Sequence, residues 1–474
     1  MAGATAGGTL PWTMNGQPGT FAAIGARSST VPDSDLNALF EGLNLYWGDI
    51  HGHTGFSDGY GTPRAYYEYG RQQRNLDFAA VTDHIEWIQL FSQRLSLNDG
   101  SSLPLWQMTV EEADRQQVPG SYVTLPGFEW TNDAYGHRNI FFRSTSDLPS
   151  NPPTSITHPT PENLWSSLAP HDAMTIPHHS TRWLKFTDWQ HVNPQFDRQV
   201  EIYSKWGNNA SIWTSYEAPK PYRRYPVVRG MLESSGVDAM LELGHRIGII
   251  AGSDTHQGMP GSTAVDTSRG TVLPRPLYPS TGEDFLSMLE EGFTFDDREP
   301  TGGGGGLAAA WAASLTRDEI WNALYDRHTC GTTGIRPIVK FGVRDSAEYE
   351  NAGLMGDELT VSGVPILDLA AIAEPGSAVT HIAIAKGNEV VATLNNPQDE
   401  IALRCVDESL APGQSAFYRA IILVRQQADA NLDGDNRLLY DEGANRFFMS
   451  PQGQHDEQAW TSPIWITRSA AQAV

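Results

Sequence analysis

Cysteine is scarce in this sequence, and long apolar runs are missing. Only two of the 474 residues are cysteines, Cys330 and Cys405, and neither stands in a CxxC spacing. A zinc ribbon or a disulfide framework is therefore not expected, and a reducing compartment fits best. No apolar stretch reaches the length of a membrane span, and residues 1–8 lack a basic segment followed by an apolar core. These absences predict a cytoplasmic protein without membrane contact, although a chain whose signal peptide had been removed would look the same and leaves a periplasmic location open.

Positive charge is scarce as well. The chain has 32 Lys and Arg residues against 56 Asp and Glu residues, which gives a formal net charge of −24 at pH 7. A chain of this charge repels polyanions, and no run of Lys and Arg provides the electrostatic footprint of a nucleic-acid binder. Nucleic acid is therefore not expected as a partner, while composition leaves the oligomeric state open.

The pattern along the chain changes twice. Residues 1–42 are rich in Gly, Ser, Thr and Pro, which predicts an irregular N-terminal arm. Residues 43–335 contain short, nearly continuous apolar runs separated by helix-like stretches, as is typical of buried parallel strands in βα order. Residues 336–474 alternate between apolar and polar positions, which predicts a β-rich C-terminal domain. The runs of the middle part are 45–50, 78–81, 122–128, 140–142, 174–176, 200–203 and 247–251.

Strands in βα order form either a barrel or a doubly wound sheet with its helices outside. The predicted fold is α/β, a distorted (β/α)7 TIM-like barrel over 43–335 with a C-terminal β-sandwich-like domain. Parallel strands of one barrel end at one face, so the active site is expected at the strand C-termini.

The strongest local signal is the segment "GDIHGHT", which contains His51 and His53. Two histidines two positions apart at the end of an extended segment project to the same side and can share one metal. On its own, the pair is equally well explained as exposed turn residues. Further His, Asp and Glu residues lie at or near the ends of the other predicted strands: Asp58, His84, Glu129, His137, His178, His179, Asp254 and His256. A lone histidine is more often structural, but a set collected on one face of a barrel predicts a metal site.

The order of these motifs resembles the PHP family, named for polymerase-associated and histidinol-phosphatase domains. A strand-ending HxH, a strand-ending His, a strand-ending Glu, a His pair and a late DxH follow one another between residues 43 and 256. The segments "GDIHGHTGFSDG", "AAVTDH", "GFEW", "HRNIFF", "IPHH", "GSDTH", "TTGIRP" and "AWTSPIWI" resemble more closely a bacterial branch known only as a domain of unknown function. The resemblance therefore implies a fold and a metal site more firmly than a substrate.

The resemblance also implies two or three divalent transition metals and their ligands. One metal would be held by His51, His53, Glu129 and Asp254, a second by Glu129, His137 and His178, and a third by Asp58, His84 and His256. Glu129 would then bridge two metals with its two oxygens, and His179 is an alternative to His178 as a ligand. Mixed imidazole and carboxylate ligands suit zinc, manganese or iron without distinguishing among them.

Such a cluster predicts a metal-dependent hydrolase, because it brings the pKa of a bridging water near neutrality and neutralises charge on the attacked group. The first hypothesis is a phosphoesterase that cleaves a phosphomonoester or phosphodiester with a metal-bridging hydroxide. The candidate catalytic residues are Asp254, Glu129, Arg138, His179 and Lys205. Cations near the strand ends, Arg182 and Arg246 among them, favour a small anionic substrate. Two alternatives are an amidohydrolase-like enzyme acting on a lactone or an amide, and a non-catalytic metal-bound module that binds a partner.

Overall fold

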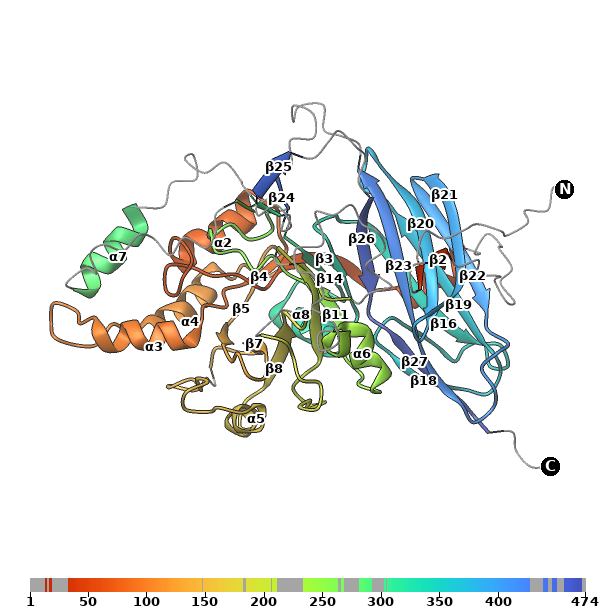
Figure 1. Ribbon diagram of the computed structural model, residues 1–474, viewed down its shortest axis with the longest axis horizontal. Coiled ribbons are helices and arrows are strands. Elements are labelled where there is room, and N and C mark those ends of the chain that lie inside the picture. The colour runs from red at the N-terminus through yellow and green to blue at the C-terminus, as the bar shows by residue number, and fades with distance from the viewer. Residues whose placement is uncertain are drawn as a thin grey trace.

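The computed structural model shows a mixed α/β part beside a β-rich C-terminal part (Figure 1). Both features were predicted and are confirmed. No helix among the described residues is long and apolar enough to cross a membrane. The structure describes residues 13–14, 17–18, 33–146, 148–181, 185–205, 207–210, 233–262, 266–267, 281–291, 302–303, 305–426, 438–441, 446–449 and 456–470. Most of the predicted arm and Arg182 lie outside these ranges.

Every apolar run of the middle part contains at least one strand. The run 122–128 contains two, β5 and β6, because Pro126 between them has no N–H group to donate to a sheet. The strands are β3 (Asn44–Asp49), β4 (Phe78–Ala80), β5 (Val123–Leu125), β6 (Gly127–Trp130), β7 (His137–Phe142), β8 (Ala173–His178), β9 (Gln199–Ser204) and β11 (Gly248–Ala251).

Several helices begin with the same local device. Thr62, Thr160 and Thr316 precede helices α2, α5 and α8, and each side-chain oxygen accepts a hydrogen bond from a backbone N–H in the first turn. The helices α3 and α4 lie on the side of the mixed part that is remote from the C-terminal strands (Figure 1). The described helices are α1 (Asp33–Leu39), α2 (Pro63–Gln72), α3 (Ile85–Arg94), α4 (Leu105–Gln116), α5 (Pro161–Leu168), α6 (Val237–Glu242), α7 (Gly282–Glu291), α8 (Arg317–Tyr325) and the 3-10 helix η2 (Glu233–Ser235).

A closed barrel is not confirmed, because the described strands of the mixed part belong to three open sheets. The strands β3, β4 and β5 form one parallel edge, β6, β7 and β8 form a second sheet, and β10 (Gly207–Asn208), β9 and β11 form a third. Strand β7 is antiparallel to both of its neighbours, unlike the parallel order that the apolar runs suggested. The connection from β6 to β7 is too short for the crossover that a parallel pair needs. Isolated bridges join the sheets at Gly52 with Thr255, His84 with Glu129 and Thr175 with Asp197.

One long sheet continues from the mixed part into the C-terminal part. Its order is β18-β27-β23-β26-β15-β14-β3-β4-β5, so β26 lies beside β15 and β14 lies beside β3. The expected border between 335 and 336 falls in the connection between β15 and β16, and the sheet crosses it. A second sheet of order β17-β16-β19-β22 faces the long sheet, and apolar side chains of both, including Phe341, Leu369, Ile382 and Ile422, share one core cluster.

The remaining strands belong to the long sheet, to the second sheet of the C-terminal part or to short two-stranded pairs. They are β1 (Thr13–Met14), β2 (Gln17–Pro18), β12 (Asp266–Thr267), β13 (Gly302–Gly303), β14 (Leu307–Ala312), β15 (Thr329–Thr332), β16 (Ile338–Asp345), β17 (Ala352–Leu354), β18 (Glu358–Val361), β19 (Pro365–Ile372), β20 (Ser377–Lys386), β21 (Glu389–Gln398), β22 (Glu400–Val406), β23 (Ser415–Gln426), β24 (Leu438–Asp441), β25 (Arg446–Met449), β26 (Asp456–Thr461) and β27 (Ile464–Arg468).

Candidate metal centre

The turn that carries the two histidines after β3 is fixed by the buried carboxylate of Asp49. Oδ1 of Asp49 accepts backbone N–H groups from His51 at 3.3 Å and from Ser253 at 3.0 Å, and Oδ2 accepts the N–H of Gly261 at 2.6 Å. The last residue of β3 therefore ties its own turn to the turn that follows β11.

Backbone hydrogen bonds complete this connection. The N–H of His53 donates to the carbonyl of Thr255 at 2.8 Å, and the N–H of Asp254 donates to the carbonyl of His51 at 2.9 Å. The HxH and DxH segments thus lie side by side, and all of their potential ligands face one buried space.

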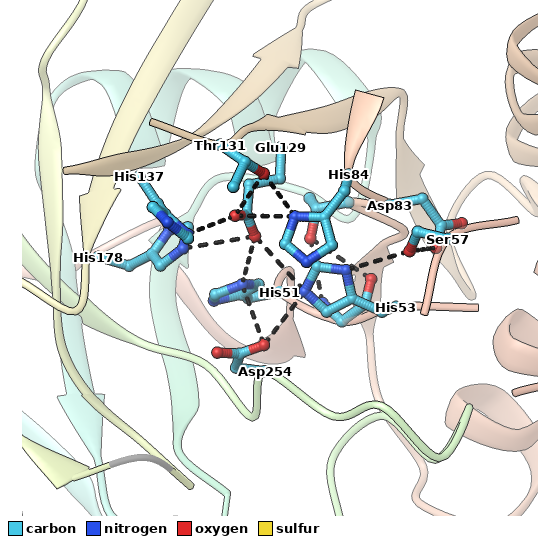
Figure 2. A network of polar contacts seen from close by, with 12 residues as sticks. His51, His53, Ser57, Asp83, His84, Glu129, Thr131, His137, His178 and Asp254 are labelled. Carbon is cyan, nitrogen blue, oxygen red and sulfur yellow. Dashed lines mark hydrogen bonds and ion pairs between the residues drawn. The ribbon is translucent and has the colours of Figure 1, made fainter. Parts of the chain in front are cut away.

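The first group of potential ligands is formed by His51, His53 and Asp254, whose donor atoms lie within 4.8 Å of one another. Oδ1 of Asp254 lies 3.4 Å from Nε2 of His51 and 3.1 Å from Nε2 of His53 (Figure 2). Oε2 of Glu129 lies 3.5 Å and 3.4 Å from the same two nitrogens. The four residues predicted to hold the first metal are therefore brought together.

A second group surrounds Glu129 at the end of β6. Nδ1 of His137 lies 2.8 Å from Oε1 of Glu129, and Nε2 of His178 lies 3.4 Å from Oε2. His137 and His178 are directly paired residues of the antiparallel strands β7 and β8, which explains why both reach the same carboxylate. The donor atoms within 4.8 Å of one another are those of His51, Glu129 and His178, whereas Nε2 of His137 lies 3.0 Å from Oδ1 of Asp133.

The third group consists of His53, Asp58, His84 and His256. Oδ1 of Asp58 lies 3.3 Å from Nε2 of His256 and 3.5 Å from Nε2 of His84. All three residues that were predicted to hold the third metal meet here, and His53 is shared with the first group.

The turn that carries Asp58 is held in place by Asp83, a buried residue shortly after the end of β4. The hydroxyls of Thr54 and Ser57 each donate to the carboxylate of Asp83 at 2.5 Å, and the backbone N–H of Thr54 donates to it at 2.7 Å. Asp83 therefore places Asp58 without being a ligand itself.

Charges of opposite sign alternate through the cluster. Burial by itself would raise the pKa of Glu129, but His84 and other histidines hold that pKa well below its usual value. Burial opposes charge on His84 too, yet Glu129 and Asp58 raise its pKa well above the usual value. The pKa of His53 is lowered to about 3 by burial, reinforced by His256 and His84. Burial thus favours the neutral form of His53, whereas the neighbouring carboxylates favour the charged form of His84.

The donor set fits divalent transition metals. Nε2 of His51 and both ring nitrogens of His178 are buried and make no hydrogen bond among the described residues. An unsatisfied buried polar atom is costly, and lone pairs that converge with carboxylate oxygens are the ligands of zinc, manganese and iron.

His179 lies against the cluster through Asp254. Its Nε2 is 2.9 Å from Oδ2 of Asp254, while Oδ1 of the same carboxylate faces His51 and His53. Both His179 and Asp254 have a φ of 52°, a left-handed conformation that non-glycine residues rarely adopt. His179 is therefore in contact with a potential ligand but outside the three groups of donor atoms.

Arg138, a candidate for substrate binding, does not reach the cluster. Neighbouring residues of a strand point to opposite faces, so a residue beside the ligand His137 points away from it. The Arg138 side chain is fully buried and donates to the carbonyls of Tyr135 at 3.1 Å and His191 at 3.0 Å, with Nε 3.6 Å from Asp197. This arginine supports the fold behind the cluster.

The other two predicted substrate cations that the structure describes, Arg246 and Lys205, lie at different distances from the cluster. Arg246 forms an ion pair with Glu358 of the C-terminal part and does not join the cluster. Lys205 follows β9, is buried, and donates its backbone N–H to the carbonyl of Ser253, the residue before Asp254. Of the predicted substrate cations, Lys205 is thus at the edge of the sheet where the cluster lies.

Glu201 was missed in the sequence although it contacts a potential ligand. It lies in β9, is 1% exposed, and places Oε2 2.6 Å from Nδ1 of His51. The available signal was a carboxylate inside the buried run 200–203, whose other residues are Val, Ile and Tyr. Thr131 was also missed, and its hydroxyl lies 2.6 Å from Nδ1 of His84 and 3.1 Å from Oε1 of Glu129.

A family model described as "Protein of unknown function (DUF3604)" matches residues 97–183 and 199–387. The chain belongs to this family. The expectation of a branch known only as a domain of unknown function is thereby confirmed. An uncharacterized protein of Chlamydia pneumoniae is 22% identical over 437 residues, which cover 89% of this DUF3604 chain and 57% of that protein. The chain thus spans little more than half the length of this relative.

Two solved structures show a distant likeness to this DUF3604 chain. A two-domain protein from Bacteroides vulgatus, described as containing a predicted PHP-like metal-dependent phosphoesterase, is 13% identical, with a TM-score of 0.39 over 85% of this chain and 95% of that chain. PsfC from Pseudomonas syringae is 16% identical, with a TM-score of 0.28 over 45% of this chain and 78% of that chain. These likenesses are too distant to carry an argument about function.

Proposed function

We propose that this DUF3604 protein is a metal-dependent hydrolase that acts on a small phosphate ester. The observation that carries the proposal is the meeting of His, Asp and Glu donors in three adjacent groups, of which His51 belongs to two and His53 belongs to two. Divalent metals bound there would lower the pKa of coordinated water and neutralise negative charge on the substrate. The isolated β-bridges that join the three sheets support a distorted barrel arrangement, with this centre at the carboxyl ends of its parallel strands.

Glu129 is suited to join two metal positions because its two oxygens face different histidines. Oε1 lies near His137 and His84, whereas Oε2 lies near His51 and His178. A carboxylate can use both oxygens in this way, whereas an imidazole has a single lone pair to offer. This arrangement supports a centre with adjacent metals.

Adjacent cations favour phosphoryl chemistry. Two neighbouring metals can stabilise both the attacking and the leaving oxygen of an in-line displacement, as in phosphatases and nucleases. The chain itself contributes Lys205 at the same edge of the sheet, in keeping with an anionic substrate. Asp254 keeps Oδ1 toward His51 and His53, so we assign it to ligand binding rather than to proton transfer.

The proposal is tested by turnover of p-nitrophenyl phosphate, bis-p-nitrophenyl phosphate, a lactone and an aryl amide. The protein is loaded in turn with zinc, manganese and iron, and each reaction is repeated after chelation. Chelator-sensitive turnover of a phosphate ester supports the proposal and separates monoesters from diesters. Turnover of the lactone or the amide alone would favour the amidohydrolase-like alternative, and binding of metal without any turnover would favour a binding module.

A further inference from the structure

Glu201 lies behind the candidate metal centre and has no part in the function proposed above. We propose that Glu201 is a positioning residue that holds the imidazole of His51, with its proton on Nδ1 and its Nε2 lone pair directed at the metal position. This inference rests on the proposed metal binding and adds a residue outside the ligand set.

The contact between the two side chains is short and buried. Nδ1 of His51 lies 2.6 Å from Oε2 of Glu201, and each side chain is 1% exposed. A carboxylate accepts hydrogen bonds, so the imidazole donates its Nδ1–H, and Nε2 is the nitrogen whose lone pair a metal can take when it displaces a proton there. Metal-binding histidines generally donate their second ring N–H to such a partner, which fixes the ring and strengthens it as a ligand.

The opposite side of the ring faces the potential ligands. Nε2 of His51 lies 3.5 Å from Oε2 of Glu129 and 3.4 Å from Oδ1 of Asp254, and it makes no hydrogen bond with any residue that the structure describes. Two carboxylate oxygens at this nitrogen favour a positive charge between them, a proton in the metal-free protein or a bound metal in its place. The orientation that Glu201 imposes is therefore the one that a metal ligand requires.

The neighbouring backbone leaves room for this contact. A Cβ on Gly252 would lie 2.7 Å from Oε2 of Glu201 and 2.8 Å from Cβ of His51, closer than real Cβ contacts allow. The backbone of Gly252 cannot easily move aside, because its N–H donates to the carbonyl of Tyr203 and its carbonyl accepts the N–H of Gly306. A glycine at this position preserves the hydrogen bond between the other two residues.

Stability alone does not account for Glu201. Glu201 is 1% exposed, and its Oε1 has no hydrogen-bond partner among the described residues. Its ion-pair partner in the described part of the chain is His51. A buried carboxylate with a single imidazole partner lowers the free energy of unfolding. The presence of Glu201 is therefore better explained by its effect on metal binding through His51.

The test compares Glu201→Gln and Glu201→Asp with Glu112→Gln, which makes the same chemical change at another buried glutamate. Glu112 lies in α4 and bonds to Gln116 and Arg115, away from the cluster. Zinc affinity is measured by competition with a chelator. It is expected to fall about 10- to 100-fold in Glu201→Gln and to stay within about twofold of wild type in Glu112→Gln. Equal zinc affinity of folded Glu201→Gln and wild type would overturn the inference.

A second readout does not depend on metal. Nitrogen NMR of metal-free, histidine-labelled wild-type protein is expected to show a proton on Nδ1 of His51, shifted far downfield by the short bond to a carboxylate. That proton should move upfield in Glu201→Asp and Glu201→Gln. A wild-type Nδ1 without a proton would overturn the inference even if neither variant folds. Wild-type protein that binds no metal but shows the Nδ1 proton would instead contradict the proposed function alone.

Discussion

His53 and Asp254 are 201 positions apart in the sequence, yet Nε2 of the histidine lies 3.1 Å from Oδ1 of the aspartate. The contact exists because the turn after β3 and the turn after β11 are hydrogen-bonded to each other and to Asp49. The cluster is therefore a product of the folded chain rather than of a local motif. Metal binding and folding should accordingly be coupled.

Replacing Glu129 is expected to affect more than one metal position. In Glu129→Gln the amide offers one oxygen in place of two, and turnover should fall by at least about 100-fold while circular dichroism stays unchanged. Metal content, measured by plasma mass spectrometry, should fall with it, whereas Glu112→Gln keeps both. Wild-type turnover by a folded Glu129→Gln protein would refute the bridging assignment.

The metal-free protein should respond to pH in a defined direction. The pKa values of His51 and His84 are raised well above 6.5 in spite of burial, by Asp254 and Glu201 for the first and by Glu129 and Asp58 for the second. A raised folded-state pKa stabilises the protein fully below pH 6.5, and this stabilisation is lost as the pH rises through the folded-state pKa. Chemical unfolding of the metal-free protein, with chelator present, should therefore show lower stability at pH 9 than at pH 6.

Zinc binding should have the opposite pH dependence, because a metal must displace protons from these imidazoles. Zinc affinity should therefore rise from pH 6 to pH 7.5. Calorimetry in buffers of different ionisation enthalpy measures the protons released. Zinc binding without proton release at pH 6 would contradict the assignment of charged His51 and His84.

Arg138 should behave as a structural residue. Its guanidinium is buried between backbone carbonyls and Asp197, so Arg138→Gln leaves a buried carboxylate poorly compensated. The free energy of unfolding should fall by about 3 kcal/mol or more, and KM should change little in the protein that remains folded. A Lys205→Met variant provides the comparison, with a raised KM for an anionic substrate and a smaller loss of stability. A large rise of KM in stable Arg138→Gln would restore Arg138 to the substrate site.

Much of the centre was predictable because a buried strand and the polar residue that ends it are both visible in the sequence. The run 78–81 marks β4, and His84 follows it, just as Glu129 lies in β6 after the run 122–128. The direction of β7 was not predictable, because an apolar run buried on both faces has the same composition in parallel and antiparallel sheets. His137 nevertheless lies 2.8 Å from Glu129, since the start of an antiparallel strand lies at the edge where parallel neighbours end.

Partners of the ligands were harder to predict than the ligands. The pairing of His51 with Glu201 joins β9 to the turn after β3, and no local spacing encodes a contact between residues so far apart. The alanine-rich strand β14 was also missed, because "LAAAWA" suits a helix as well as a strand until β3 and β15 are seen on either side of it.

The central claim, that this cluster binds metals, is tested most directly by plasma mass spectrometry of the purified protein and two variants. His178→Ala removes a potential ligand whose two ring nitrogens make no hydrogen bond within the described part of the chain, and His171→Ala removes a histidine outside the three groups. Two or three equivalents of zinc, manganese or iron are expected in wild type and in His171→Ala, with fewer in His178→Ala. Absence of metal from wild type even after reconstitution, or equal metal in all three proteins, would contradict the account.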